Sequence, residues 1–400
     1  MNTALDFGIF QMPEVRPERN WTLYFDQIVQ EARLAEDLGF DEYWVGEHHT
    51  KAHETVPDPL MMLSRIAEAT ERIRLGPATV NLTYEINDPF NVAEKLAFLD
   101  QLSNGRANYG FGAGALPRDM AMFNVDEERQ KDIMWEAIDV IETYTDATEL
   151  TDFDGEFFQY EDRIVQLPPL QEEPPTAVAG FTSTGSYSGA IEGGHRPLTL
   201  PFSPLSAPDN PDALGLKRMG ETIDEAATSL GRDPQAARRE WSIARDVYVT
   251  DSKEQALEEI REGAEEYYDY MLGLGDGGLL QFVKTDPEQT RDDLTVEWLV
   301  ENLPMIVGSP DECIKQISAL HQEVGGFGTL IVNSHDWMLP EQKWRDSLEL
   351  FAQEVMPAFQ SRKGPREIEK EQVPGYEPVE LAADEDPFAI DSSKVIGTGD

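Results

Sequence analysis

The sequence is poor in cysteine and has no long apolar runs, and both shortages narrow what the protein can be. Cys313 is the one cysteine among 400 residues, so no disulfide can form within the chain, as suits a reducing cytosol. No stretch approaches the roughly 18 consecutive apolar residues of a membrane span, and the N-terminus lacks the basic region of a signal peptide. We therefore expect a cytoplasmic protein in which Cys313 is a small buried hydrophobe at a helix-core position.

Basic residues are also scarce, and lysine is the scarcer of the two. The chain has 32 Lys and Arg against 77 Asp and Glu, a formal net charge of −45, and only 11 of the 32 are lysines. This charge argues against binding to nucleic acid or to anionic membranes. Because molar salt shortens the Debye length to about 3 Å, it would screen the repulsion within so acidic a chain. We therefore expect a halophilic protein.

Strand-like and helix-like segments alternate along the chain. The expected strands are 5–10, 42–46, 73–82, 106–112, 176–181, 197–202, 241–250 and 328–333. The expected helices are 22–38, 59–70, one from Pro89 to Gly105, a region ending near 147, a short one from Ser183, 211–230, 253–272, 309–323 and 340–359. Eight strands that are each followed by helical sequence favour a closed parallel barrel over a doubly wound open sheet, the alternative.

The sequence thus predicts an α/β protein with one (β/α)8 TIM barrel over residues 1–360, with insertions at the C-terminal strand ends. A hairpin is expected at 153–167. Segment 273–303 is too long for a simple connection, so it is a lid or partly disordered. Residues 364–400 carry ten acidic against three basic residues, and we interpret 361–400 as an acidic tail, extended or disordered.

Three motifs follow strand ends, where barrel enzymes place their catalytic groups. The first is Gly46-Glu47-His48-His49. A histidine suits proton transfer near neutral pH, although a pair of surface histidines is the structural alternative. The other histidines show no metal-ligand spacing, so we expect no metal site.

The second and third motifs combine small and hydroxyl-bearing residues. Tyr109–Gly114 would let a flat ring approach the backbone closely, or would serve tight packing alone. It follows the fourth strand without a ribose-binding acid, so a dinucleotide-binding Rossmann fold is rejected. Gly180–Ser186 places hydroxyls at a helix N-terminus, which suits a phosphate, or ordinary helix capping.

Taken in order, the motifs resemble those of the luciferase-like flavin monooxygenases over roughly residues 4–360. The matching segments are Leu38–His49, Pro89–Arg106 with its ending Leu-Asp-Gln-Leu-Ser-Asn-Gly-Arg, and Gly308–Cys313. The resemblance implies a (β/α)8 barrel that binds reduced FMN supplied by a separate flavin reductase. It also implies that a flavin C4a-(hydro)peroxide, formed with O2, oxygenates a small apolar organic substrate.

The resemblance further assigns residues to roles. His48 matches the active-site histidine near the flavin, and Ala78 and Thr79 match a segment that often has a non-prolyl cis peptide below the isoalloxazine ring. Gly112 and Ala113 match the end of strand four, where bacterial luciferase has a Cys-Arg pair. This chain has neither residue, which argues against light emission and against that arginine's contact with phosphate.

The phosphate end is expected at the helix that starts near Ser183. Phe181 and Thr184 match phosphate-contacting positions of the family, and we add Ser183, Gly185 and Ser186 from the helix-end argument. We also expect a homodimer.

Alternatives remain open at this stage. A relative could use a reduced deazaflavin for hydride transfer without oxygen, or the chain could be a non-catalytic flavin-binding protein. A metal-dependent barrel hydrolase is disfavoured by the histidine spacing. A terpene, an aldehyde or a ketone would all suit an apolar cavity, so the sequence leaves the substrate open.

Overall fold

The computed structural model describes residues 4–14, 19–50, 56–181, 183–207, 209–210, 213–273, 280–334 and 340–360. The chain divides into two units, Met1–Ser361 and Arg362–Asp400, and everything below concerns the first. The predicted acidic tail, 361–400, lies outside the described residues.

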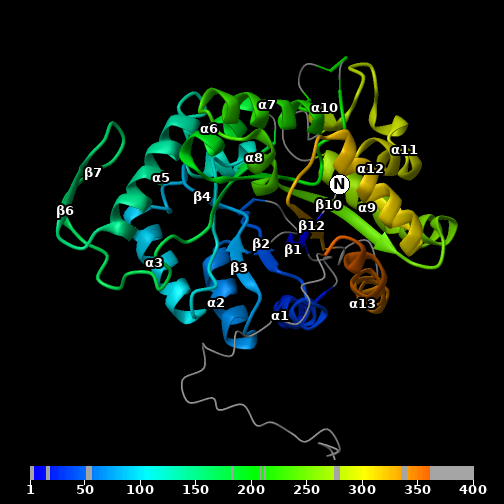
Figure 1. The fold of residues 1–400 in the computed structure, drawn as a ribbon, viewed down its shortest axis with the longest axis horizontal. Coiled ribbons are helices and arrows are strands. Elements are labelled where there is room, and N and C mark those ends of the chain that lie inside the picture. Colours follow the sequence, from blue (N-terminus) through cyan, green and yellow to red (C-terminus); the bar gives the residue numbers. More distant parts are fainter. Residues whose placement is uncertain are drawn as a thin grey trace, which may run out of the picture. The chain divides into compact units, whose positions relative to one another are not determined.

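The described part of the chain builds a parallel sheet that closes on itself (Figure 1). Its strands run in the order β3-β2-β1-β12-β10-β9-β8-β5-β4. They are β1 (Asp6–Gln11), β2 (Glu42–Val45), β3 (Arg74–Pro77), β4 (Val80–Asn81), β5 (Tyr109–Gly112), β8 (Thr176–Gly180), β9 (Arg196–Thr199), β10 (Ser242–Val249) and β12 (Thr329–Asn333). Only Ala78 and Thr79 separate β3 from β4, the two ends of this order, so together they act as one strand that closes the barrel.

Helices cover the outside of the sheet (Figure 1). They are α1 (Trp21–Leu38), α2 (Pro59–Ala69), α3 (Pro89–Leu102), α4 (Pro117–Met122), α5 (Gln130–Asp146), α6 (Thr184–Gly193), α7 (Leu216–Ser229), α8 (Pro234–Glu240), α9 (Lys253–Leu272), α10 (Leu280–Val283), α11 (Val296–Asn302), α12 (Pro310–Glu323) and α13 (Glu341–Leu350). With the strands, they make the (β/α)8 TIM barrel that the sequence predicts.

Side-chain caps fix where several helices begin. Asp58 accepts hydrogen bonds from the first turn of α2, and Asp88 does the same for α3; a proline follows each at the first helical position. At α12, Ser309 and Glu312 form the reciprocal capping box expected from the sequence. These local signals explain why so many of the predicted boundaries lie within a few residues of the observed ones.

Some connections differ from expectation. The helical region predicted to end near 147 is two helices, α4 and α5, because residues 123–129 turn between them. The short strand β11 (Ile306–Gly308), which pairs with β10, and the short helix α8 were not predicted. Neither element is long enough to show a clear period.

Two inserted segments also have structure of their own. β6 (Thr151–Asp154) and β7 (Gln159–Arg163) pair antiparallel where the sequence predicts a hairpin, and Figure 1 shows them projecting beyond α3 and α5. Within segment 273–303, the described residues form α10, a 3₁₀ turn and α11.

The N-terminal end of the barrel is closed by polar side chains from the first residues of the strands. Arg196 Nη1 donates to Glu42 Oε1 at 2.6 Å, and its Nη2 donates to Ser242 Oγ at 3.0 Å and Thr329 Oγ1 at 3.3 Å. Apolar side chains fill the next layer: Trp44, Leu198, Ala244 and Ile331 surround one narrow space. The open end of the barrel is therefore the C-terminal one.

Candidate functional site

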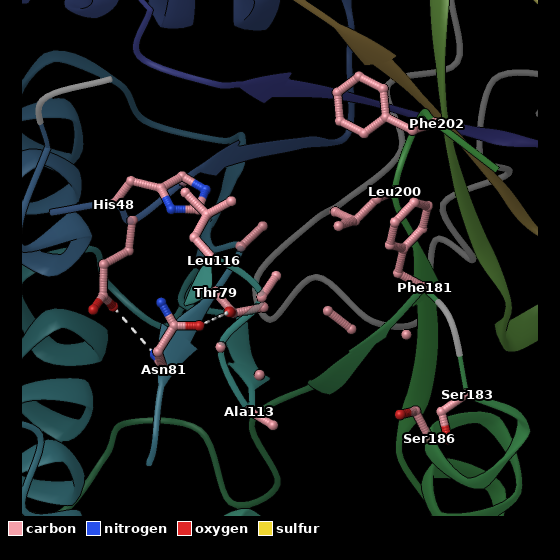
Figure 2. A pocket seen from close by; sticks show the side chains of 18 of the residues that line it. His48, Thr79, Asn81, Ala113, Leu116, Phe181, Ser183, Ser186, Leu200 and Phe202 are labelled. Carbon is pink, nitrogen blue, oxygen red and sulfur yellow. Dashed lines mark hydrogen bonds between the residues drawn. The ribbon is translucent and has the colours of Figure 1, made fainter. Parts of the chain in front are cut away.

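A cavity of about 250 Å³ lies at the C-terminal ends of the barrel strands. Eight of the ten site residues predicted from the sequence line it: His48, Ala78, Thr79, Gly112, Ala113, Phe181, Ser183 and Ser186. Thr184 and Gly185 are exposed on the first turn of α6 and do not line it. In Figure 2, His48 lies on the opposite side of the view from Ser183 and Ser186.

Small residues line the cavity at the strand ends, among them Gly46, Ala78, Gly112 and Ala113. The peptide bond between Ala78 and Thr79 is cis, as the resemblance implies for this segment. Beside it, a Cβ atom on Gly112 would collide with the side chain of Thr79, which would have to shift. Thr79 Oγ1 in turn donates to Asn81 Oδ1 at 3.2 Å, a bond drawn in Figure 2.

His48 is oriented by a residue that the sequence did not single out. Its Nδ1 lies 2.9 Å from Oδ2 of Asp119, a fully buried residue on α4. Burial raises the pKa of Asp119, but hydrogen bonds from His48 and Thr50 lower it further, so its pKa is below the ordinary value. An ionised carboxylate can only accept hydrogen bonds, so Nδ1 of His48 carries a proton.

Glu47 and His49 of the same motif hold the loop together. Glu47 is buried; its Oε2 accepts from the backbone N–H of Asn81 at 3.2 Å, and its Oε1 lies 3.1 Å from Nε2 of His49. Asn87 Nδ2 also donates to Glu47 Oε1, at 3.3 Å. Glu47 therefore ties the end of β2 to β4, next to the cis peptide bond.

The opposite side of the cavity has a positively charged side chain beside a helix N-terminus. Ser183 is the N-cap of α6, where its Oγ accepts from the N–H of Gly185 at 3.2 Å. Lys131, in the first turn of α5, donates from Nζ to the same Oγ at 2.7 Å. Among the described lining residues, Lys131 is the only lysine or arginine.

Apolar side chains from distant segments form another wall of the cavity. They are Phe10, Met12, Leu116, Met120, Phe181, Leu200, Phe202, Met271 and Phe282, several of which are labelled in Figure 2. Phe282 belongs to α10, and its ring meets that of Phe181 edge-on with centroids 5.9 Å apart. The segment predicted to be a lid therefore contributes a side chain to the cavity.

Three other features of the described residues bear on function. No group of three or more His, Cys, Asp or Glu side chains that could hold a metal ion occurs among them. Nor does the described part of the chain contain a helix long and apolar enough to cross a membrane. Cys313 is buried in α12, where burial raises the pKa of its thiol to about 12. A thiol so protonated is a poor nucleophile.

Comparison with known proteins identifies the family. The model of the luciferase-like monooxygenases matches residues 5–326 of the chain. The protein belongs to the luciferase-like monooxygenase family. It is therefore an enzyme, as the sequence predicts.

The chain is similar to oxygenases, and it shares its fold with coenzyme F420-dependent enzymes. 4-Hydroxyprotoasukamycin monooxygenase of Streptomyces nodosus subsp. asukaensis is 33% identical over 89% of this chain and 92% of its own. The oxygenating constituent of 3,6-diketocamphane monooxygenase from Pseudomonas putida was solved with FMN. It is 26% identical with a TM-score of 0.73, and the match covers 88% of this chain and 98% of that one. The coenzyme F420-dependent tetrahydromethanopterin reductase of Methanopyrus kandleri shares the fold. Its identity is 20% and its TM-score 0.68, and the match covers 89% of this chain and 100% of that one.

The cavity of this family member fits FMN on three structural observations. The side lined by Gly46, Ala78, Gly112 and Ala113 carries no bulky side chains and can take an aromatic ring. Gln130, which lines the cavity, has a buried Oε1 without a hydrogen-bond partner in the described part of the chain, an acceptor for a sugar-alcohol hydroxyl. Lys131 and the α6 N-terminus offer a cation and N–H groups to a phosphate.

Proposed function

We propose that this enzyme uses reduced FMN and O2 to insert an oxygen atom into a small apolar organic substrate. The observation that carries the proposal is a cavity that combines a side lined by small residues, a cationic end at Lys131 and an apolar wall. The identity of 33% to an oxygenase over 89% of the chain supports it. Bound reduced FMN would supply the electrons that activate O2.

The residues of the chain have separable tasks in this reaction. Lys131, Ser183 and Ser186 bind the phosphate, and the strand ends at Ala78–Thr79 and Gly112–Ala113 support the ring. The hydroxyl of Ser183 can still donate to the phosphate, because Oγ accepts from Lys131 and Gly185. Phosphate recognition in this chain therefore needs no arginine at Ala113.

The apolar wall both selects the substrate and excludes water. Phe202, Leu200 and Met271 present hydrocarbon and thioether groups, which favour substrates such as terpenes, long aldehydes or ketones. A dry cavity also protects reactive oxygenating species from loss to water. We propose that α10 acts as part of a lid, because its Phe282 completes this wall beside Phe181.

The experiment that tests the proposal combines binding with turnover. The purified enzyme is supplied with FMN, a flavin reductase, a nicotinamide donor and a panel of terpenes, aldehydes and ketones under air. We expect oxygen uptake that depends on the substrate, with products that have gained one oxygen atom. Hydride transfer to or from a deazaflavin without oxygen uptake would instead establish the deazaflavin alternative, and tight FMN binding without turnover would leave a flavin-binding protein.

Three further expectations remain part of this proposal: a separate flavin reductase as partner, a homodimer, and a cytoplasmic, halophilic setting. The expectation of a reductase is supported by the Pseudomonas putida relative, which is named as an oxygenating constituent. The halophilic expectation follows from the net charge of −45.

A further inference from the structure

A buried carboxylate, that of Asp119, contacts His48 from outside the cavity that His48 lines. Asp119 is fully buried and does not line the cavity, yet the two oxygens of its side chain receive four donors. Oδ2 is 2.9 Å from Nδ1 of His48 and accepts from the N–H of His49 at 3.3 Å. Oδ1 accepts from the N–H of Thr50 at 2.6 Å and from the Thr50 hydroxyl.

The short helix α4 explains how Asp119 reaches this place. Leu116, its N-cap, and Met120 both line the cavity, while Asp119, one residue before Met120, is directed to the loop after β2. This one turn of α4 therefore supplies both a part of the cavity wall and the carboxylate that contacts His48. Any shift of this turn would move both.

The other ionisable groups around the motif have different partners. Glu47 is engaged by His49, Asn81 and Asn87. Tyr84, whose ring lies edge-on to His49, has a pKa raised by burial and by the charges of Asp119 and Glu47, so it stays a neutral phenol. Asp119 is the carboxylate that contacts the His48 ring in the described structure.

We propose that Asp119 is a positioning residue that keeps a proton on Nδ1 of His48, which makes Nε2 the proton-accepting nitrogen. The proposal rests on the proposed function for the role of His48. In the step concerned, an O–H or N–H bond of the bound reactant breaks, its electron pair stays on the heavy atom, and the proton moves to Nε2. Asp119 stabilises the resulting imidazolium and does not take the proton.

The Asp119→Asn substitution should reverse the tautomer rather than merely weaken the contact. The backbone N–H and hydroxyl of Thr50 both donate to Oδ1, whereas the N–H of His49 makes only a longer contact of 3.3 Å with Oδ2, so the amide oxygen of the substituted side chain stays on the Thr50 side. The NH₂ group of that amide then faces His48 and donates to Nδ1. The proton of the imidazole is thereby forced onto Nε2.

The tautomer can be read directly from the imidazole ¹⁵N chemical shifts of His48 in the cofactor-free protein. We expect a protonated Nδ1 in the wild type and a protonated Nε2 in D119N. A wild-type His48 with its proton on Nε2 would overturn the inference whether or not any variant folds. Because no flavin is present, this measurement is independent of the proposed reaction.

Turnover tests whether Asp119 acts through His48. We expect D119N to lower kcat by about 100-fold in the wild-type background, an effect typical of residues that orient a catalytic histidine. In a His48→Ala background the same substitution should lower kcat less than about threefold, because nothing remains to be oriented. Equal losses in both backgrounds would mean that Asp119 supports the fold instead.

Thr50→Val serves as the matched control. It removes one hydrogen bond to the same carboxylate and leaves the contact with His48 in place. We expect it to change kcat less than about threefold and to keep the wild-type tautomer. A T50V variant as impaired as D119N would also contradict the inference. A wild type without any turnover would instead contradict the proposed function, with the tautomer result still standing.

Discussion

The two ends of the barrel both hold charged or titratable side chains, but they use them in opposite ways. At the N-terminal end, Arg196 and Glu42 satisfy each other together with Ser242 and Thr329. Burial lowers the pKa of Arg196, but the charge and hydrogen bonds of Glu42 raise it more, and the net shift is upward. At the C-terminal end, Lys131 and His48 line a cavity.

The difference separates stability from activity. A closed set of buried charges resists change, because removal of one partner leaves the other uncompensated. A set that faces a cavity keeps donors and acceptors for a ligand. Substitutions at the N-terminal end should therefore cost folding free energy, and substitutions at the C-terminal end should cost binding or turnover.

The largest effect on turnover is expected for His48→Ala. General acid–base contributions are typically about 100- to 10,000-fold, so kcat should fall within that range while the melting temperature stays near that of the wild type. The measurement is steady-state turnover with saturating reduced FMN and substrate. His49→Ala is the comparison, because the ring of His49 contacts Glu47 and lies beside Tyr84. An equal loss of kcat in this variant would mean that the catalytic role was assigned to the wrong histidine.

The next largest effect is expected at the other end, on stability. Glu42→Gln leaves a partly buried Arg196 without its counter-charge, which should lower the free energy of unfolding by about 3 kcal/mol, the low end of the range for buried ion pairs. Denaturant unfolding measures this loss, and kcat per folded molecule should be unchanged. As a control, Arg218→Gln breaks the exposed pair with Glu225 and should leave stability nearly unchanged. A fall in kcat for Glu42→Gln without loss of stability would break the comparison.

A smaller effect is expected at the cationic end of the cavity. Lys131→Met should weaken FMN binding about tenfold and riboflavin binding hardly at all, since riboflavin lacks the phosphate. Fluorescence titration with both flavins measures the difference. The Ser186→Ala and Thr184→Ala single variants refine it: Ser186 lines the cavity and should matter, whereas Thr184 is exposed and should not. Equal weakening of both flavins would remove the phosphate assignment.

Salt should have the smallest effect per residue, because it screens charges over the whole surface and not at either end of the barrel. Between about 0.1 M and 1 M salt the Debye length falls from about 10 Å to 3 Å, so repulsion among the excess acids is screened. We expect the melting temperature to rise by more than about 5 °C in multimolar KCl, equally for the wild type and Glu42→Gln. A melting temperature that stays constant across this range would remove the halophilic expectation.

Local sequence patterns predicted most of the elements. His48 and Ser183 follow recognisable strands and Gly112 ends one, and the eight-strand order places all such ends on one side. Thr184 and Gly185 were also predicted to bind phosphate, because the argument from the helix N-terminus covered every residue of its first turn. Helical periodicity separates them: successive residues are about 100° apart, so Ser183 and Ser186 share a face that their neighbours do not.

The residues that sequence reasoning missed come from helices. Lys131 meets Ser183 from 52 residues away, and Asp119 meets His48 from 71 residues away. Neither lies in a strand-end motif, so no local signal distinguishes it from a solvated helix residue. Only the packing of α4 and α5 over the strand ends brings Lys131 to the cavity and Asp119 to His48. Lysine is scarce in this chain, which draws attention to Lys131, whereas acidic residues are abundant and composition does not draw attention to Asp119.

The most direct test of the central claim is a crystal structure of the enzyme with FMN. We expect the phosphate within hydrogen-bond distance of Lys131 Nζ and Ser183 Oγ, and the isoalloxazine ring against the Ala78–Thr79 peptide on the side of His48. FMN bound elsewhere, or bound with its phosphate away from α6, would contradict the account.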